Sequence, residues 1–118
     1  MQQDTETLVV GVDLGGTKIA SAVINAHGEI LSRDYRATPV TQDLQTVVRE
    51  ILASVSGAVD KIGALAKKVA ALGIAVAGFS NPESGVVYTS PHVPALQNAP
   101  LRDIIESKSN KKAFLIND

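Results

Sequence analysis

Cysteine is absent from the 118 residues of the chain, which excludes disulfides and thiolate-bound metals in this segment and fits a cytoplasmic protein. No apolar run approaches the roughly 20 residues that a membrane-spanning helix needs, and residues 1–7 are polar and acidic, unlike a signal peptide. Basic residues form only short pairs such as Lys67-Lys68, within a formal net charge of -1. Nucleic-acid binding therefore has no electrostatic support, and we expect neither a nucleic-acid nor a membrane partner.

The composition is that of an ordinary folded domain. Hydrophobic residues make up 45% of the chain and charged residues 19%, with no internal repeat, low-complexity run or linker. A chain of this length can bury roughly two-thirds of its unfolded surface in one core. We expect a disordered tail over residues 1–7 and one domain over residues 8–118.

The most informative stretch is an apolar run that ends in a glycine pair. The run of Val and Leu without polar alternation predicts a strand over residues 8–12 that is covered on both faces. Gly15 and Gly16 permit a sharp turn whose backbone can approach a ligand closely, because neither residue carries a Cβ. Residues 18–24 are again apolar and β-branched, so we expect the chain to return as an antiparallel strand.

The polar groups at this turn indicate an anionic ligand. The tip of the hairpin offers backbone N–H groups, the Thr17 hydroxyl and the Lys18 ammonium. Asp13 would repel a polyphosphate unless a divalent cation stood between them, and Mg²⁺ binds through one or two carboxylates plus substrate phosphates. The pattern therefore favours Mg·ATP. The alternative is that Asp13 only closes an Asx-turn.

Two better-known phosphate motifs do not describe this turn. Walker A requires a lysine followed by serine or threonine, whereas Thr17 precedes Lys18 and a strand rather than a helix follows. The dinucleotide fingerprint requires a glycine spacing that Gly11, Gly15 and Gly16 do not have.

The rest of the chain alternates helix and strand patterns. Apolar positions at helical spacing predict a helix that Thr41 caps and that has a kink or break near Gly57. Its buried face consists of Leu44, Val47, Val48, Ile51, Leu52 and Val55. Asn98 and Pro100 mark the start of a second helix. Further strands are predicted over residues 29–35, 69–76, 86–89 and 113–116. Strands and helices in this order predict an α/β domain.

Three candidate site positions follow predicted strands. Asp13, Gly78 and Asp118 each stand just beyond the end of one. Ligands in open α/β sheets collect beyond the carboxyl ends of the strands, so we expect the three to share one cleft. The alternative for any single position is that strand ends favour Asp and Gly as turn formers.

Four motifs in the same order resemble the ROK family (repressors, open reading frames, kinases), which includes bacterial glucokinases within the superfamily of sugar kinases, Hsp70 and actin. The motifs are Asp13-Leu14-Gly15-Gly16-Thr17-Lys18, Gly73-Ile74-Ala75-Val76-Ala77-Gly78, Ser90-Pro91-His92-Val93-Pro94 and Asn117-Asp118. The resemblance implies a ribonuclease H-like lobe of the actin-like ATPase type. Its mixed sheet would open with three antiparallel strands and be flanked by helices.

The resemblance assigns roles at the sugar end of the site. Asp118 matches the catalytic carboxylate that accepts the proton of the sugar hydroxyl, and Asn117 matches a sugar-binding amide. Gly78 matches a position where sugar approaches the backbone. His92 stands in a sugar-contact motif where the family often has asparagine. Phe79 stands where the family often has proline. It could pack in the core or cover a sugar face, and we expect it to pack in the core.

At the phosphate end, the resemblance implies ATP and Mg²⁺ as cofactors. Asp13 would hold Mg²⁺ through water, and the residues that would face phosphate are Gly15, Gly16, Thr17 and Lys18. The family's second lobe carries adenosine contacts, further sugar ligands and a Cys/His zinc site, and it has no counterpart in these 118 residues.

We therefore predict the N-terminal lobe of an ATP-dependent sugar kinase that transfers the γ-phosphate of Mg·ATP to a hexose hydroxyl, of glucose or a related sugar. We expect this lobe to be inert alone and the complete protein to be a homo-oligomer. One alternative is a sugar-responsive regulator, disfavoured because a helix-turn-helix segment would precede the strand at residue 8. The other is a binding module of the actin or Hsp70 type, disfavoured by the sugar-contact motifs at residues 90–92 and 117–118.

Overall fold

The computed structural model describes residues 7–117. Residues 1–6, nearly all of the predicted tail, lie outside the described residues. The elements in chain order are β1 (Leu8–Leu14), β2 (Lys18–Ile24), β3 (Ile30–Ala37), α1 (Leu44–Asp60), the 3₁₀ helix η2 (Gly63–Lys68), β4 (Val69–Val76), β5 (Phe79–Asn81), β6 (Val86–Thr89), β7 (Gln97–Ala99), α2 (Leu101–Ser109) and β8 (Lys112–Asn117). No helix between residues 7 and 117 is long and apolar enough to cross a membrane.

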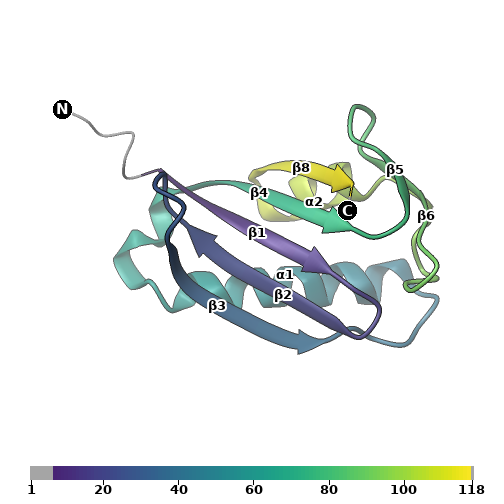
Figure 1. Ribbon diagram of the computed structural model, residues 1–118, viewed down its shortest axis with the longest axis horizontal. Helices are drawn as coiled ribbons and strands as arrows, with labels where there is room; N and C mark the ends of the chain where they lie inside the picture. Colours follow the sequence, from purple (N-terminus) through teal and green to yellow (C-terminus); the bar gives the residue numbers. More distant parts are fainter. Residues whose placement is uncertain (1–6, 118) are drawn as a thin grey trace.

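Five strands form the main sheet in the order β3-β2-β1-β4-β8 (Figure 1). The first three are antiparallel neighbours, whereas β4 pairs in parallel with β1 and with β8. This is the mixed sheet that the sequence predicts, and it opens with three antiparallel strands. Because β1, β4 and β8 run the same way, their carboxyl ends lie at one edge of the sheet.

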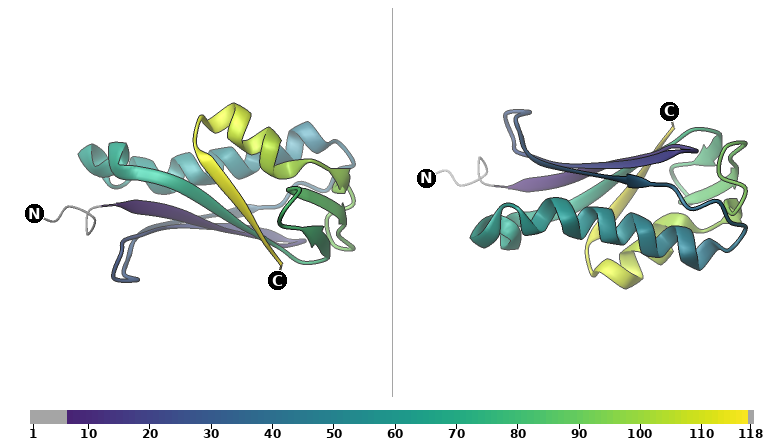
Figure 2. Two further views of the ribbon diagram at one scale, coloured as in Figure 1. Left: turned by 90° about the horizontal axis from the view of Figure 1, so that it is seen from above. Right: turned by 90° about the horizontal axis from the view of Figure 1, so that it is seen from below.

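Helices cover only one face of this sheet (Figure 2). On that covered face, α1 packs against β2 and β3, and α2 packs against β8. Val10, Val12 and Leu14 of β1 point into this core and are at most 3% exposed. The alternate residues of β1 face the other way, where Val9 is 38% exposed. The prediction that this strand is covered on both faces is therefore wrong for the part of the chain that the structure describes.

Helix α1 differs from its prediction at both ends. Its N-cap residue is Asp43, and Thr41 instead accepts the Asp43 N–H through Oγ1 at 3.0 Å. The helix runs unbroken through Gly57 to Asp60, so the predicted break is wrong. A Cβ at Gly57 would lie 2.2 Å from Asp34 Oδ1, which shows that this glycine admits the Asp34 side chain against the helix.

A second, three-stranded sheet in the order β5-β6-β7 stands beyond the end of β4. The sequence predicts β6 but neither β5 nor β7, which are only three residues long. Asn98 lies in β7 with a φ of 49°, and Pro100 occupies the N-cap position of α2, so the predicted cap is wrong. Phe79 of β5 is 72% exposed, so its predicted place in the core is also wrong.

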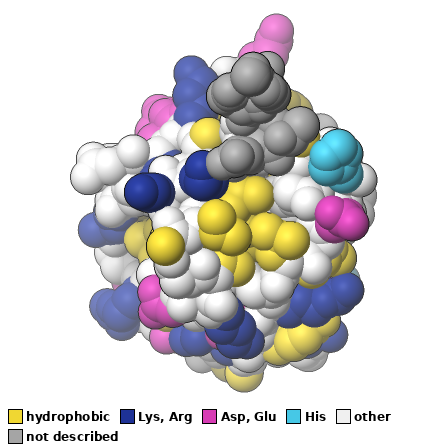
Figure 3. Space-filling model, turned by 90° about the vertical axis from the view of Figure 1, so that its left-hand side faces the viewer, with side chains coloured by type: hydrophobic (Ala, Val, Ile, Leu, Met, Phe, Trp, Pro, Cys, Tyr) yellow, Lys and Arg dark blue, Asp and Glu magenta, His cyan; other side chains and the backbone are white. Residues whose placement is uncertain are grey.

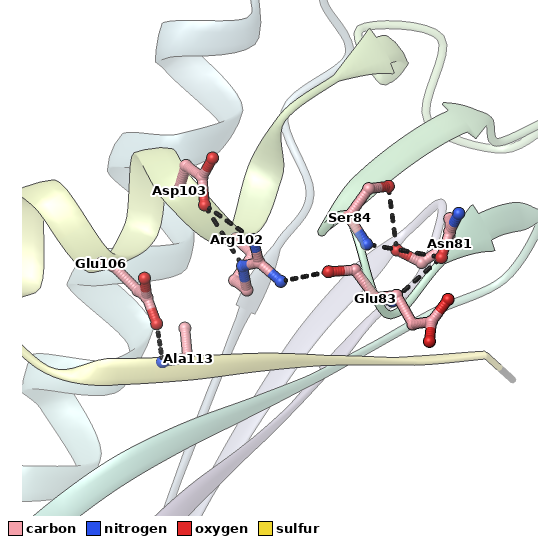
Figure 4. A network of polar contacts seen from close by, with 7 residues as sticks. All are labelled: Asn81, Glu83, Ser84, Arg102, Asp103, Glu106 and Ala113. Atoms are coloured by element: carbon pink, nitrogen blue, oxygen red, sulfur yellow. Dashed lines mark hydrogen bonds and ion pairs between the residues drawn. The ribbon is translucent and has the colours of Figure 1, made fainter.

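Polar side chains of α2 fasten both sheets to this helix (Figure 4). Arg102 donates from Nη1 to the Glu83 carbonyl at 2.9 Å, which ties the turn between β5 and β6 to the start of α2. Glu106 Oε2 accepts the Ala113 N–H at 2.9 Å, which ties the start of β8 to the same helix. Helix α2 therefore sets the position of the β5–β6 hairpin relative to β8.

Figure 3 shows the end of the molecule at which β1 and β4 begin. The surface at this end is mixed in character. Basic and acidic side chains are interspersed there around a small hydrophobic patch. The strands β1, β4 and β8 run away from this end, and the predicted site residues gather where they finish.

Candidate functional site

The glycine turn, residues 15–17, joins β1 to β2. It is closed by a hydrogen bond from the Gly15 N–H to the Lys18 carbonyl at 3.0 Å. Gly15 and Gly16 are not among the residues with positive φ, so the turn does not depend on left-handed backbone. Gly16 needs to be glycine for another reason, because a Cβ there would lie 2.6 Å from His92 Cβ. The loop that carries His92 therefore packs directly on the turn.

Thr38 holds the glycine turn from a second side and was not predicted as a site residue. Its Oγ1 donates to the Gly15 carbonyl at 2.7 Å, and its backbone N–H donates to the Thr17 carbonyl at 3.0 Å. The side chain is buried between the turn and the end of β3. Nothing in the sequence distinguishes Thr38 from other polar residues that follow a strand, so only the tertiary structure reveals this contact.

Asp13 and Lys18 flank the turn on the uncovered face of the sheet. Asp13 is exposed and lies within β1, paired with Ala20, rather than just beyond the strand as predicted. The Lys18 ammonium lies 5.0 Å from the centroid of the Tyr35 ring, a cation–π distance. Both charged groups thus lie beside the glycine turn.

Within residues 7–117, no group of three His, Asp or Glu side chains is arranged to hold a metal ion. Asp13 offers a single exposed carboxylate. Mg²⁺ commonly binds one or two carboxylates and completes its shell with waters and substrate phosphates. The donor set therefore fits Mg²⁺ that arrives with a nucleotide, and it does not fit a metal ion held by protein ligands alone.

Gly78 stands at the junction between the two sheets. It has a φ of 134°, and a Cβ there would lie 2.3 Å from the Thr89 carbonyl oxygen. The neighbouring Ala77 carbonyl accepts a hydrogen bond from Ser90 Oγ at 2.8 Å. Internal packing and backbone conformation alone are enough to require glycine here.

At the end of β8, the Ser80 hydroxyl donates to Asn117 Oδ1. This contact joins β5 to β8 and occupies the oxygen of the Asn117 amide. Asp118, the predicted catalytic carboxylate, lies outside the described residues.

Together, these contacts connect the four motifs, which are distant in the sequence. Gly16 touches His92, Ser90 is bonded to Ala77 beside Gly78, and Ser80 is bonded to Asn117. The structure thus brings the glycine turn and three of the predicted sugar-contact residues, Gly78, His92 and Asn117, to one end of the sheet. It places Asp13 and Lys18 next to this group, on the uncovered face.

Known proteins resemble the chain over almost its whole length. Residues 9–118 match the ROK family. The chain is 35% identical over 111 residues to a glucokinase from Streptomyces coelicolor, covering 94% of this chain and 32% of that protein. It is 32% identical to an N-acetylmannosamine kinase from Vibrio cholerae, covering 92% and 35%. A xylose repressor from Caldicellulosiruptor bescii is 29% identical, covering 93% and 27%.

Among solved structures, a ROK family glucokinase from Streptomyces griseus in complex with glucose and AMPPNP superposes with a TM-score of 0.82 at 34% identity. The match covers 93% of this chain and 33% of that chain. The fold is thus that of the ROK kinases, which have the actin-like ATPase architecture. The chain spans about a third of the length of the relatives it matches.

Proposed function

The chain belongs to the ROK family, and on that premise we propose that it forms the first lobe of an ATP-dependent sugar kinase. The complete protein would transfer the γ-phosphate of Mg·ATP to a hydroxyl of a hexose. By itself the lobe would be inert, because an ATP held between two lobes is not gripped by one. The complete enzyme would be a cytoplasmic homo-oligomer.

The contact between Gly16 and His92 carries this proposal. A kinase must hold a phosphoryl donor and an acceptor hydroxyl next to each other, because phosphoryl transfer depends mainly on positioning and charge stabilisation. Here the glycine turn and the loop with His92 pack against each other without space for one Cβ. Because of this contact, the turn that would bind phosphate and the loop that would bind sugar are held at a fixed separation.

Each residue of the site has a distinct task in this mechanism. The backbone N–H groups of Gly16 and Thr17 would bind phosphate oxygens, assisted by the Thr17 hydroxyl and the Lys18 ammonium, while the Gly15 N–H closes the turn. His92 and Asn117 would bind sugar hydroxyls. The Asn117 amide nitrogen would donate, and its oxygen, which already accepts from Ser80, retains one acceptor position. When bound with the nucleotide through water to Asp13, Mg²⁺ would neutralise phosphate charge.

Asp118 would act as the base. It would accept the proton of the attacking hydroxyl late in the reaction, because the transition state is loose and the nucleophile needs little activation. Asn117 lies directly before it, so the end of β8 would supply both the group that orients the hydroxyl and the group that receives its proton.

The acceptor would be a hexose or amino hexose. The glucokinase from Streptomyces griseus contains glucose and AMPPNP, an ATP analogue, and the relative from Vibrio cholerae is named for N-acetylmannosamine. A panel of both sugar classes, tested with the complete protein, would identify the substrate.

A sugar-responsive regulator is the second candidate, because the xylose repressor is similar over 93% of this chain. The two functions differ in turnover. A regulator would bind sugar without forming a phosphorylated product, and the complete protein would bind DNA.

Replacing Asp118 with Asn in the complete protein tests the kinase proposal. The amide keeps the size of the side chain but cannot accept the proton. We expect turnover to fall at least ~100-fold, the lower range of general-base contributions, while sugar and ATP affinities change only several-fold. The measurements are phosphorylated sugar per enzyme, sugar affinity and melting temperature.

Parental turnover in Asp118→Asn would show that Asp118 is not the base. A parent protein that forms no sugar phosphate from any hexose of the panel would overturn the kinase function itself. A change in melting temperature alone would assign Asp118 a structural role.

A further inference from the structure

Thr38 makes two hydrogen bonds to the glycine turn, and both end on carbonyl oxygens. Oγ1 donates to the Gly15 carbonyl at 2.7 Å, and the backbone N–H donates to the Thr17 carbonyl at 3.0 Å. The residue is 6% exposed, so water does not compete freely for these bonds. Thr38 therefore fixes the direction of two carbonyl groups in the turn, those of Gly15 and Thr17.

Fixing these carbonyls also fixes the neighbouring amides. All peptide bonds of the described residues are trans, and in a planar trans peptide the C=O and N–H groups point in opposite directions. The N–H groups of Gly16 and Lys18 share peptide planes with the Gly15 and Thr17 carbonyls. They are therefore directed away from Thr38.

His92 limits the turn from the other side of Gly16. Its Cβ and carbonyl oxygen would lie 2.6 Å and 3.0 Å from a Cβ on Gly16, so the peptide cannot rotate far toward that loop. The loop is itself anchored by Ser90 and by Val93, which is 1% exposed. The orientation of the turn is thus determined by contacts within the fold.

We propose that Thr38 is a positioning residue for phosphate binding, which acts through the glycine turn and not by touching the ligand. It draws two carbonyl oxygens, which would repel a phosphate, away from the ligand side and leaves the Gly16 N–H group directed toward it. This proposal rests on the proposed kinase function. It predicts that the Thr38 hydroxyl affects ATP more than sugar.

The test compares Thr38→Val with Thr38→Ser in the complete protein. Valine keeps the branched shape and the backbone N–H but lacks the hydroxyl, whereas serine retains the hydroxyl. We expect Thr38→Val to raise the KM for ATP about three- to tenfold, the factor that corresponds to one net hydrogen bond. The KM for the hexose and kcat should stay near the parental values, and Thr38→Ser should restore the ATP dependence.

Thr46→Val is the matched control. It also deletes a hydroxyl hydrogen bond, from Thr46 Oγ1 to Asp43 Oδ2 at 2.6 Å, but at the start of α1 rather than at the turn. It should leave the KM for ATP unchanged. Melting temperature and circular dichroism are recorded for every variant, and Thr38→Ala replaces Thr38→Val if the latter does not fold.

Three results would overturn the positioning role. They are a parental KM for ATP in a folded Thr38→Val or Thr38→Ala variant, an equal rise in the KM values for ATP and hexose, and failure of Thr38→Ser to restore ATP dependence. In each case the parent enzyme would still be a sugar kinase. Conversely, a parent protein that neither phosphorylates a hexose nor binds ATP would overturn both this proposal and the kinase function.

Discussion

Both faces of the main sheet carry large apolar residues, but on one face these residues are buried beneath helices and on the other they are exposed. On the covered face, Leu72 and Ile74 of β4 are at most 1% exposed beneath the helices. On the opposite face, which we call the open face, Phe114 and Ile116 of β8 are each 52% exposed. An antiparallel or mixed sheet with one solvated side normally shows polar residues there. The open face departs from that pattern around β8 and the central strands, although Asp13 and Lys18 also lie on it.

The open face also has a particular shape. Small residues of the central strands form the floor of a hollow of about 650 Å³, and larger apolar side chains form its rim. The floor consists of Gly11, Ala20, Ala22, Ala71, Gly73 and Ala75. A continuous apolar surface of this kind marks a binding or packing face in most soluble proteins. The contrast shows that an apolar strand pattern predicts a surface that is suitable for burial. It does not predict that the surface is buried within the same chain.

The largest expected difference between the two faces concerns stability. Ile74→Ala should lower the free energy of unfolding by about 3 kcal/mol, because it leaves a cavity in the covered face. Ile116→Ala, the same change on the open face, should lower it by less than about 1 kcal/mol. Urea unfolding of the 118-residue chain, followed by circular dichroism because tryptophan is absent, measures both. Equal losses would show that the open face is covered in solution.

A smaller effect concerns association. The exposed apolar surface of the open face should make the 118-residue chain self-associate and bind a hydrophobic dye at high concentration. Replacing Phe114 and Ile116 together with serine should weaken association about tenfold, through the loss of two half-exposed apolar contacts. Sedimentation velocity measures this change.

Val40→Ser is the control for that experiment, because Val40 is fully exposed but lies in the connection between β3 and α1. It should leave association unchanged. A parent chain that is strictly monomeric and silent to the dye would contradict the expectation for the open face.

The smallest expected effect concerns the loss of stability at acid pH and an ion pair in the edge strand β3. Asp34 of β3 receives hydrogen bonds from Arg36 Nε at 2.9 Å and Nη2 at 3.2 Å, and this contact lowers the pKa of Asp34 below its usual value. The folded state therefore binds fewer protons than the unfolded state near pH 4. The stabilisation is complete above the unfolded pKa of about 4 and is lost as pH falls through the lowered folded value.

Asp34→Asn should therefore flatten the loss of stability below about pH 4, measured by urea unfolding at a series of pH values. Arg36→Lys keeps a cation beside the carboxylate but loses the paired geometry, so its pH dependence should fall between those of the parent and Asp34→Asn. An acid dependence in Asp34→Asn identical to that of the parent would show that this pair does not govern acid stability.

The elements that could be predicted from the sequence are those with long apolar runs between turn residues. The predicted boundaries of β2, β4 and β6 agree with the structure to the residue. In these segments β-branched residues, burial and flanking glycines all favour the same conformation. The buried stripe of α1 is confirmed for Val47, Val48 and Ile51, which are at most 1% exposed. Leu44, Leu52 and Val55 are partly buried against the same core.

The features that could not be predicted depend on contacts between distant residues. Strands β5 and β7 have three residues each and no apolar period. The exposure of Phe79 depends on which side of the short sheet it faces. Gly57 interrupts a helical pattern in the sequence. In the structure, the absence of a side chain at Gly57 leaves space for the Asp34 side chain.

The candidate site shows the same division. The glycine turn and the motif at His92 are recognisable as separate pieces of sequence, but their packing against each other is not. Thr38 has no sequence signature, because its role consists of two hydrogen bonds across the end of the sheet. The roles of Gly78, His92 and Asn117 in sugar chemistry stay predictions, and the role of Asp118 is the one that Asp118→Asn tests.

The parallel pairing of β1 with β4 determines when the sheet can be completed. Leu8 pairs with Val69, about sixty residues later in the chain, whereas the β1–β2–β3 meander needs only short-range turns. Closing so long a loop costs entropy before any contact compensates for it, and contacts this distant in sequence slow folding. During synthesis, β1 therefore stays an unpaired sheet edge until β4 has been made. An edge of this kind can pair with strands of other chains, so the strand that leads into the glycine turn is also exposed to misassembly in a newly made chain.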